Sequence, residues 1–520
     1  MTQVCDRKQN RTSPSSAVSR STLTRRLRRQ ARRLECMETR YAELEQQLQE
    51  KSRALQDCEN QLAFAKAQLA EQACCQPAAQ HPIYRERPLP GHQFAPTLIA
   101  LAISLSMRIG QHATADVLAL VFDALGIDLK VPSHDAIGQW GLRLGVASLQ
   151  DTFTKDQRVL WMVDHSSQIG KEKVLLIIGI ALDDLPPPEE TLNLSKMKVL
   201  AIVPGESWKK KDVEREYRKL ADQIGAPVFL LCDGASELRD PASVLQRDGK
   251  KTIVLGDLKH HAANLLEKEV GRTERFKSFI TEIGLTRNRV QQTELSHLAP
   301  PALKQKSRFM NLGPLLRWAR MVLYHLNHPA STARTGIEVD RIESKLGWLR
   351  EYAKDVFEWD KCQRLINVSL KIINRHGLDK TTAHAVQAAL QEWDGNWQAD
   401  DTAASRIGQQ LIAWITESAS RLPDGERAWL STEILESLFG RFKQLSRQHS
   451  KGGFTRLIAM LPMLCGKVTA DHVRTGFRRV DARALQKWLS DTLGPTLTAR
   501  RNAAYHEAFK QNLEQTSVTA

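Results

Sequence analysis

Two aspartates directly follow apolar runs that are typical of buried strands. Asp164 comes after residues 158–163, and Asp233 comes after residues 227–232. Because ligands of α/β sheets bind at the carboxyl ends of the strands, we expect both side chains at one such edge. Carboxylates brought together need a compensating cation, and Mg²⁺ takes its oxygen ligands from carboxylates and phosphate groups. The two aspartates therefore predict a Mg²⁺ site.

A third carboxylate is expected on a helix that crosses this sheet edge. Residues 423–425 (Pro-Asp-Gly) predict a break, and a helix is predicted from about Thr432 to Gln448. That helix carries Glu433 and Glu436, which lie on nearly the same helical face. Helix geometry alone leaves both glutamates as candidates for the third ligand.

The elements that must position these acids follow the order of a mixed α/β sheet. Apolar runs predict five strands, with a helix over about 209–224 after the third strand and a second short helix after the fourth. Near-continuous apolar strands are typical of a sheet covered on both faces. We assign 151–262 to the first part of this α/β core. The runs lie at 158–163, 173–182, 197–203, 227–232 and 252–255.

The long stretch between the second and third acids indicates an insertion. From about residue 263 to 425 the pattern is helical and irregularly amphipathic, and a bare α/β core does not need so many residues there. We therefore predict an all-α insertion over 263–425, followed by a segment, 426–450, that carries the glutamate helix and completes the core.

A heptad repeat occupies the N-terminal region, 1–75. Apolar side chains recur every seven residues, which predicts a coiled coil that joins subunits into at least a homodimer. The alternative is one long helix packed against its own chain. The repeat consists of Leu27, Leu34, Tyr41, Leu48, Leu55, Leu62 and Leu69.

Arginines crowd the start of this repeat and favour contact with nucleic acid. A basic helix that leads into a zipper can lie in a DNA groove. The alternative is a solvated arm that touches phosphates without sequence preference. The arginines expected to contact DNA are Arg25, Arg26, Arg28, Arg29, Arg32 and Arg33.

The next region predicts a small helical domain. Residues 76–93 are rich in proline and predict a linker, and 94–150 predict three short helices with tight turns. Such helices suit a helix-turn-helix DNA-binding domain, and a plain helical subdomain is the alternative. On the third helix, His134, Gln139 and Arg143 are predicted to face DNA.

Charge and composition favour a polyanionic partner. The formal net charge is +15, which attracts a phosphate backbone, although charge alone also suits a ribosomal or membrane-surface protein.

No apolar run reaches the roughly 18 residues of a membrane span, so we expect a cytoplasmic protein without a membrane partner. The scattered cysteines favour reduced thiols over a zinc site. Residues 451–520 are predicted to be basic and helical, with a disordered tail.

Short strings surround the three candidate acids: Trp161-Met-Val-Asp-His165, Cys232-Asp-Gly-Ala-Ser236 and Ile434-Leu-Glu-Ser-Leu-Phe-Gly-Arg-Phe-Lys443. These strings resemble those of bacterial insertion-sequence transposases of the DDE type, and the likeness covers about residues 92–450. It implies an integrase-like, ribonuclease H-like core in which Asp164, Asp233 and Glu436 hold two Mg²⁺ ions, for which Mn²⁺ substitutes. It also implies a nucleoid-associated bacterial enzyme that cleaves double-stranded transposon ends and joins the freed 3′-hydroxyl to target DNA.

The surroundings of Glu436 match one large branch of these enzymes in part. Lys443 follows Glu436 at the spacing of the E-x6-K part of that branch's signature. Trp429 and Thr432 occupy the region where the branch has a Tyr and an Arg before the glutamate. The lysine spacing and the Glu-Ser-Leu-Phe context favour Glu436 over Glu433 as the third acid.

Further residues are implied as accessories to the site. The string from Asp257 to His260 resembles the C/D-x2-H pattern of hAT-like transposases, which also carry a helical insertion before the catalytic glutamate. By this likeness the two residues hold the target phosphate or the leaving group. The alternative is that they cap and brace the helix behind them. His165 could reach the site, and Arg441 and Lys443 are expected to bind phosphates.

Two other functions fit parts of the same pattern. A transposase-derived DNA-binding regulator would use the coil and the helix-turn-helix domain without catalysis, but all three acids are intact. A structure-specific nuclease of the same fold would explain the acids and the charge, but it gives less reason for a helix-turn-helix domain. Recognition of a defined DNA end separates a transposase from a nuclease.

Overall fold

The computed structural model divides into two compact units, Met1–Glu86 and Arg87–Ala520. In the first unit, residues 43–64 are helical, and the heptad leucines Leu48, Leu55 and Leu62 are 70%, 64% and 56% exposed. The other heptad positions and the arginine run lie outside the described residues, so the coiled coil stays a prediction. The structure describes residues 40, 43–64, 66, 86–165, 173–205, 207–302, 309, 312–328, 339–398, 401–448, 454–494 and 501–509.

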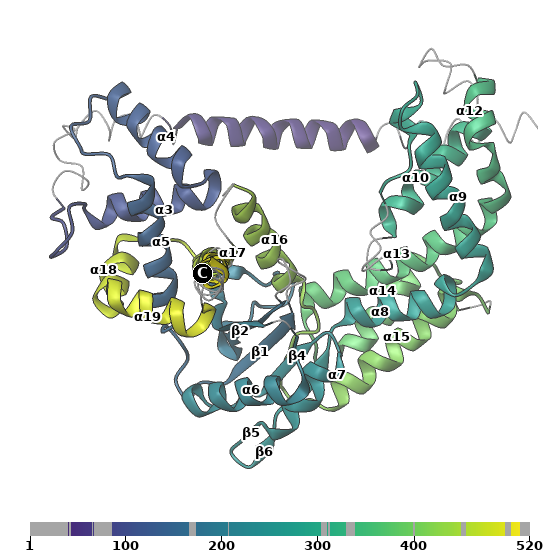
Figure 1. The fold of residues 1–520 in the computed structure, drawn as a ribbon. Coiled ribbons are helices and arrows are strands. Elements are labelled where there is room, and N and C mark those ends of the chain that lie inside the picture. Colours follow the sequence, from purple (N-terminus) through teal and green to yellow (C-terminus); the bar gives the residue numbers. More distant parts are fainter. Residues whose placement is uncertain are drawn as a thin grey trace, which may run out of the picture. The chain divides into compact units, whose positions relative to one another are not determined.

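A mixed sheet of five strands forms the centre of the second unit, as predicted (Figure 1). The strand order is β3-β2-β1-β4-β7. Strand β2 runs antiparallel to β1 and β3, whereas β4 and β7 run parallel to β1. A short hairpin of β5 (Gln246–Arg247) and β6 (Lys250–Lys251) precedes β7. The sheet strands are β1 (Val159–His165), β2 (Lys173–Ala181), β3 (Lys198–Gly205), β4 (Phe229–Cys232) and β7 (Ile253–Gly256).

Both faces of the sheet are covered, because successive strand residues point to opposite sides and nearly all of them are apolar. Trp161 and Val163 pack on the side of α6 (Lys210–Ile224) and α7 (Ser236–Arg239). Leu160 and Met162 belong to the larger core on the other side, which includes α8 (Leu258–Leu266) and most of the helical region. The predicted burial of the sheet on both faces is confirmed.

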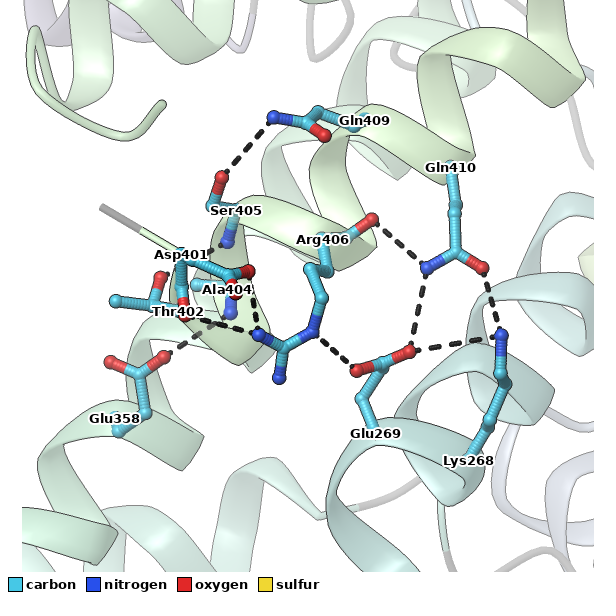
Figure 2. Close-up of polar contacts among 10 residues, drawn as sticks. All are labelled: Lys268, Glu269, Glu358, Asp401, Thr402, Ala404, Ser405, Arg406, Gln409 and Gln410. Atoms are coloured by element: carbon cyan, nitrogen blue, oxygen red, sulfur yellow. Dashed lines mark hydrogen bonds and ion pairs between the residues drawn. The ribbon is translucent and has the colours of Figure 1, made fainter. Parts of the chain in front are cut away.

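The predicted helical insertion is also observed. Polar contacts fasten its helices to one another: Arg406 Nε donates to Glu269 Oε2 at 2.8 Å, and the backbone N–H of Ala404 donates to Glu358 Oε1 at 3.2 Å (Figure 2). The elements after α8 are a π-helical turn (Glu267–Gly271), α9 (Glu274–Val290), α10 (Gly313–Asn327), α12 (Val339–Leu346), α13 (Ala353–His376), α14 (Thr382–Trp393) and α15 (Ala403–Ser420).

The chain returns to the sheet through α16 (Glu433–Arg447), the helix predicted from about Thr432 to Gln448. A turn at Gly425, which has a φ of 76°, precedes an isolated bridge between Leu378 and Ala428. The backbone N–H of Leu258 then donates to the carbonyl of Leu430 at 2.8 Å, which joins the start of α8 to the segment before α16.

The region 94–150 contains the three predicted helices, α3 (Pro96–Ile109), α4 (Gln111–Ala124) and α5 (His134–Ser148). Segments of the predicted C-terminal region, 451–520, pack against them. Figure 1 shows α18 (Ala470–Arg479) and α19 (Ala482–Leu493), in yellow, beside the blue α5.

The contact between α5 and the C-terminal region is close. A Cβ at Gly145 would stand 1.8 Å from the carbonyl oxygen of Ala459, so the two backbones can approach only because residue 145 is glycine. Residues of the predicted 94–150 and 451–520 regions therefore pack directly against each other. None of the described helices is long and apolar enough to span a lipid bilayer.

Candidate active site

Asp164 and Asp233 lie at the same edge of the sheet. In the parallel pair of β1 and β4, Val163 is in register with Cys232. Asp164 directly follows Val163, and Asp233 directly follows Cys232. The alternation of side chains places both aspartates on the face that α8 covers, together with Met162. The convergence expected from the sequence is therefore present.

The electrostatics of this pair suit a cation. Burial and the neighbouring Asp233 carboxylate raise the pKa of Asp164 to about 7. Asp164 Oδ1 accepts a hydrogen bond from the backbone N–H of His165 at 2.7 Å, and Asp233 Oδ1 accepts one from Ala235 at 2.9 Å. A divalent ion would relieve the repulsion between the two carboxylates, so their oxygen atoms fit the donor set that Mg²⁺ prefers.

Asp257 occupies the corresponding position on the next strand, because Cys232 is in register with Gly256. Its side chain is buried, and its two oxygens bind helix termini. Oδ1 accepts from the backbone N–H of His260 at 2.8 Å, and Oδ2 accepts from that of Thr432 at 2.5 Å. Burial works against the charged form, but these hydrogen-bond partners lower the pKa of Asp257 overall. The carboxylate thus caps α8 and anchors the start of α16.

His260 brings to this edge an imidazole that carries a positive charge when it is protonated. Its Nδ1 lies 3.3 Å from Asp257 Oδ1. Burial alone would lower the pKa of His260, but Asp257, Asp233 and Asp164 together raise it. The imidazole is therefore placed to offset the three carboxylates. That it holds a phosphate or a leaving group remains a prediction.

Glu433 and Glu436 are bound by a lysine that sequence reasoning did not identify. Lys259 Nζ lies 2.7 Å from Glu436 Oε2 and 3.4 Å from Glu433 Oε1. Asn374 Nδ2 also donates to Glu433 Oε2 at 2.7 Å. Among the described residues, no three His, Cys, Asp or Glu side chains are arranged to hold one metal ion. The structure gathers Asp164 and Asp233 but leaves Glu436 paired with Lys259.

The face of the sheet opposite the acids carries His165. The ring of His165 lies nearly parallel to the Trp208 indole, at an interplanar angle of 17° with centroids 6.3 Å apart. The indole Nε1 donates to the carbonyl of Lys173 at 3.1 Å. Side-chain alternation therefore directs His165 toward α6, on the other side of the sheet from the two aspartates.

Lysines gather beside Trp208. Because β3 is parallel to β1, its carboxyl end reaches the same edge as Asp164, and the segment after it leads into α6. Lys209, Lys210 and Lys211 are exposed there, and Lys210 Nζ lies 2.5 Å from Asp240 Oδ2. The Trp-Lys-Lys-Lys string was visible in the sequence, but only the strand directions show that it follows a strand ending at the same sheet edge as the acids.

A pocket of about 500 Å³ adjoins Asp233 and Asp257. The ring of His261 stacks on Trp414 within it, with centroids 4.5 Å apart. Basic and aromatic side chains are thus next to the acids. Other residues that line the pocket include Arg239, Asn264 and Arg421.

The expected DNA contacts on α5 require a correction at Arg143. Its guanidinium donates to the backbone carbonyls of Phe477 and Val480 and lies over the Phe477 ring, 4.3 Å from the centroid. Arg143 therefore binds α18 instead of facing DNA. Gln139 is exposed, whereas the ring of His134 stacks on His112 with centroids 3.7 Å apart.

Arg441 and Lys443, the two residues of α16 that are expected to bind phosphates, are both exposed. Arg441 Nη1 donates to the carbonyl of Leu464 at 3.2 Å, so one of its donors is in use. Lys443 is exposed on the same helix. Their contact with DNA stays a prediction, and the arginines from Arg25 to Arg33 lie outside the described residues.

Comparison with known proteins adds a distant structural likeness. No protein-family model and no curated protein matches the chain. The Drosophila P element transposase strand transfer complex is a similar solved structure, at 12% sequence identity and a TM-score of 0.35, with 81% of this chain and 100% of that chain covered. A superposition this loose assigns neither residues nor activity.

Proposed function

We propose that this chain is a DNA transposase of the DDE type, with Asp164, Asp233 and Glu436 as its three acids. One observation carries the proposal. Two aspartates end adjacent parallel strands of a five-stranded mixed sheet, and a glutamate-bearing helix returns to that sheet after a helical insertion. The bacterial insertion-sequence subtype rests on the three short sequence strings.

The chemistry would be phosphodiester cleavage followed by strand transfer. Mg²⁺, held by Asp164, Asp233 and Glu436, would lower the pKa of bound water and stabilise the leaving oxygen. The freed 3′-hydroxyl then attacks a target phosphodiester in the same site, so one bond forms as another breaks. No covalent protein intermediate and no nucleotide hydrolysis are needed.

The lysines at the start of α6 support DNA as the substrate. Lys209, Lys210 and Lys211 are exposed at the edge that also carries Asp164 and Asp233. Phosphate groups neutralised by lysines release counterions, which favours binding without base recognition. A DNA backbone that crosses this edge would pass the acids.

The N-terminal helix supports a homodimer. Leu48, Leu55 and Leu62 expose most of their side-chain surface in the first unit, and the heptad spacing would bury them against a second copy. Two subunits would hold two transposon ends together for strand transfer.

A cleavage assay tests the proposal. The full chain is incubated in Mg²⁺ with labelled DNA that flanks its own gene, beside Asp164→Asn, Asp233→Asn and Glu436→Gln. Asp222→Asn, on the exposed surface of α6, is the matched control. Nicks at defined positions that only the first three variants lose would support the proposal.

Other outcomes of this assay separate the alternatives. Cutting that survives Glu436→Gln but not Glu433→Gln would move the third acid to Glu433. Cutting that depends on DNA structure and not on the end sequence would identify a nuclease. Specific binding by the wild type without cleavage would identify a regulator and overturn the proposal.

A further inference from the structure

Lys259 is a cation placed between two carboxylates of the glutamate helix. Its side chain is 20% exposed, and its Nζ is 2.7 Å from Glu436 and 3.4 Å from Glu433. Burial works against the ammonium charge, but the two glutamates raise the pKa of Lys259 overall. A lysine this far from solvent keeps its charge because the carboxylates are there.

The surrounding hydrogen bonds fix this arrangement. Asp257 caps α8 through His260 and also binds Thr432, the residue before α16. Lys259 is the second residue of α8, so it faces the first turn of α16, which carries both glutamates. Glu433 has an additional partner in Asn374. Glu436 could therefore exchange Lys259 for another cation, while the hydrogen bond from Asn374 keeps Glu433 in place.

We propose that Lys259 is a positioning residue that binds Glu436 in place of the divalent ion, so that the ion and the ammonium group compete for one carboxylate. The inference rests on the proposed function, since it takes Glu436 as the third acid. In this structure Lys259 is the cation that Glu436 binds. Entry of the ion would exchange one cation for another on Glu436.

Direct binding of Mn²⁺ to the full chain, measured by isothermal titration without DNA, tests this competition. Lys259→Met keeps the length of the side chain and removes its charge. We expect it to bind Mn²⁺ about tenfold more tightly, the size expected for losing a competing charge-assisted hydrogen bond. Lys277→Met is the control, because Lys277 also lies 2.7 Å from a glutamate, Glu274, but on an exposed helix surface. It should leave the affinity unchanged.

The double variant separates this inference from the proposed function. Glu436→Gln alone should weaken Mn²⁺ binding, and adding Lys259→Met to it should then change nothing. If Glu436→Gln leaves binding unaltered, the proposed third ligand is wrong. If Glu436→Gln weakens binding but Lys259→Met does not strengthen it, the competition alone is refuted.

Two controls show whether a change in Mn²⁺ affinity comes from the lost charge or from a loss of folding. Lys259→Arg retains the positive charge and should keep an affinity close to that of the wild type, and thermal unfolding of each variant shows whether it is folded. Tighter binding by Lys259→Arg and Lys259→Met alike would contradict the role of charge. If Lys259→Met does not fold, Lys259→Gln replaces it with the same expected increase, and no increase would overturn the proposal.

Discussion

The buried carboxylate of Asp257 accepts hydrogen bonds from both the backbone N–H and the hydroxyl of Thr432, which lies 175 residues farther along the chain. This contact ties the last strand of the sheet to the first turn of the glutamate helix. It spans the whole helical insertion, so the position of Glu436 relative to the sheet depends on it.

Asp257→Ala should destabilise the protein strongly. The change removes a helix cap and leaves buried donors at Thr432 unpaired, which together cost about 2–4 kcal/mol. Urea unfolding at pH 7 measures the loss, with Asp222→Ala on exposed α6 as the control. Because the pKa of Asp257 is lowered in the folded state, its contribution is present at neutral pH and is lost as the pH falls through that lowered pKa. A loss below about 0.5 kcal/mol would contradict the anchoring role.

Asp164→Asn should stabilise the metal-free protein at high pH. Folding raises the pKa of Asp164 from 3.8 to about 7, so the folded state is penalised when the carboxylate is charged. The penalty is absent below the unfolded pKa and is complete above pH 7. We expect a gain of about 1–3 kcal/mol at pH 8 in EDTA, and much less at pH 5.

Denaturant unfolding at the two pH values measures this gain. Adding Mg²⁺ should stabilise the wild type and leave Asp164→Asn nearly unchanged, because only the wild type keeps both carboxylates. A variant that is less stable than the wild type at pH 8 without metal would show that the two aspartates do not repel each other.

Lys209→Ala combined with Lys211→Ala should weaken DNA binding and its dependence on salt. Each phosphate contact adds about 0.9 to the slope of log K against log salt, so losing two contacts should reduce the slope by about 2. Fluorescence anisotropy with duplex DNA at several salt concentrations measures this slope.

The hairpin before β7 provides the control for this pair. Lys250 and Lys251 are exposed lysines at the opposite, amino end of β7. Replacing both should alter the slope less than replacing Lys209 and Lys211. Equal effects of the two pairs would mean that DNA does not prefer the edge that carries the acids.

Leu48→Asp combined with Leu55→Asp should convert a dimer into a monomer. Both leucines are exposed within their own chain. An aspartate at either position therefore costs little free energy unless a second helix buries it. Sedimentation velocity shows the change, and Gln47→Glu on the same helix is the control. If the double variant keeps its mass, the heptad helix does not join subunits.

The sequence predicted those features of the fold that depend on local pattern. Apolar runs located the five strands to within a few residues, and the turn before Thr432 located α16. The positions of Asp164 and Asp233 followed from strand ends. These features depend on periodicity and on turn residues, which neighbouring positions in the chain determine.

Other features depend on contacts between distant segments and could not be predicted. Arg143 looked like an exposed polar residue on a helix, but the carbonyls of Phe477 and Val480 bind it. Lys259 lies in the string from Asp257 to His260, but its contact with Glu436 depends on the hydrogen bond by which Asp257 joins α8 to the start of α16. Nothing in a local pattern indicates which helix covers which face.

Strand transfer into a supercoiled plasmid tests the central claim most directly. A duplex that ends in the sequence flanking the gene, with a free 3′-hydroxyl, is incubated with the full chain, target plasmid and Mg²⁺. We predict covalent joining of the duplex to the plasmid, abolished by a 3′-deoxy end and by Asp233→Asn. Joining that persists with Asp233→Asn, or its absence with the wild type, would contradict a transposase active site at this sheet edge.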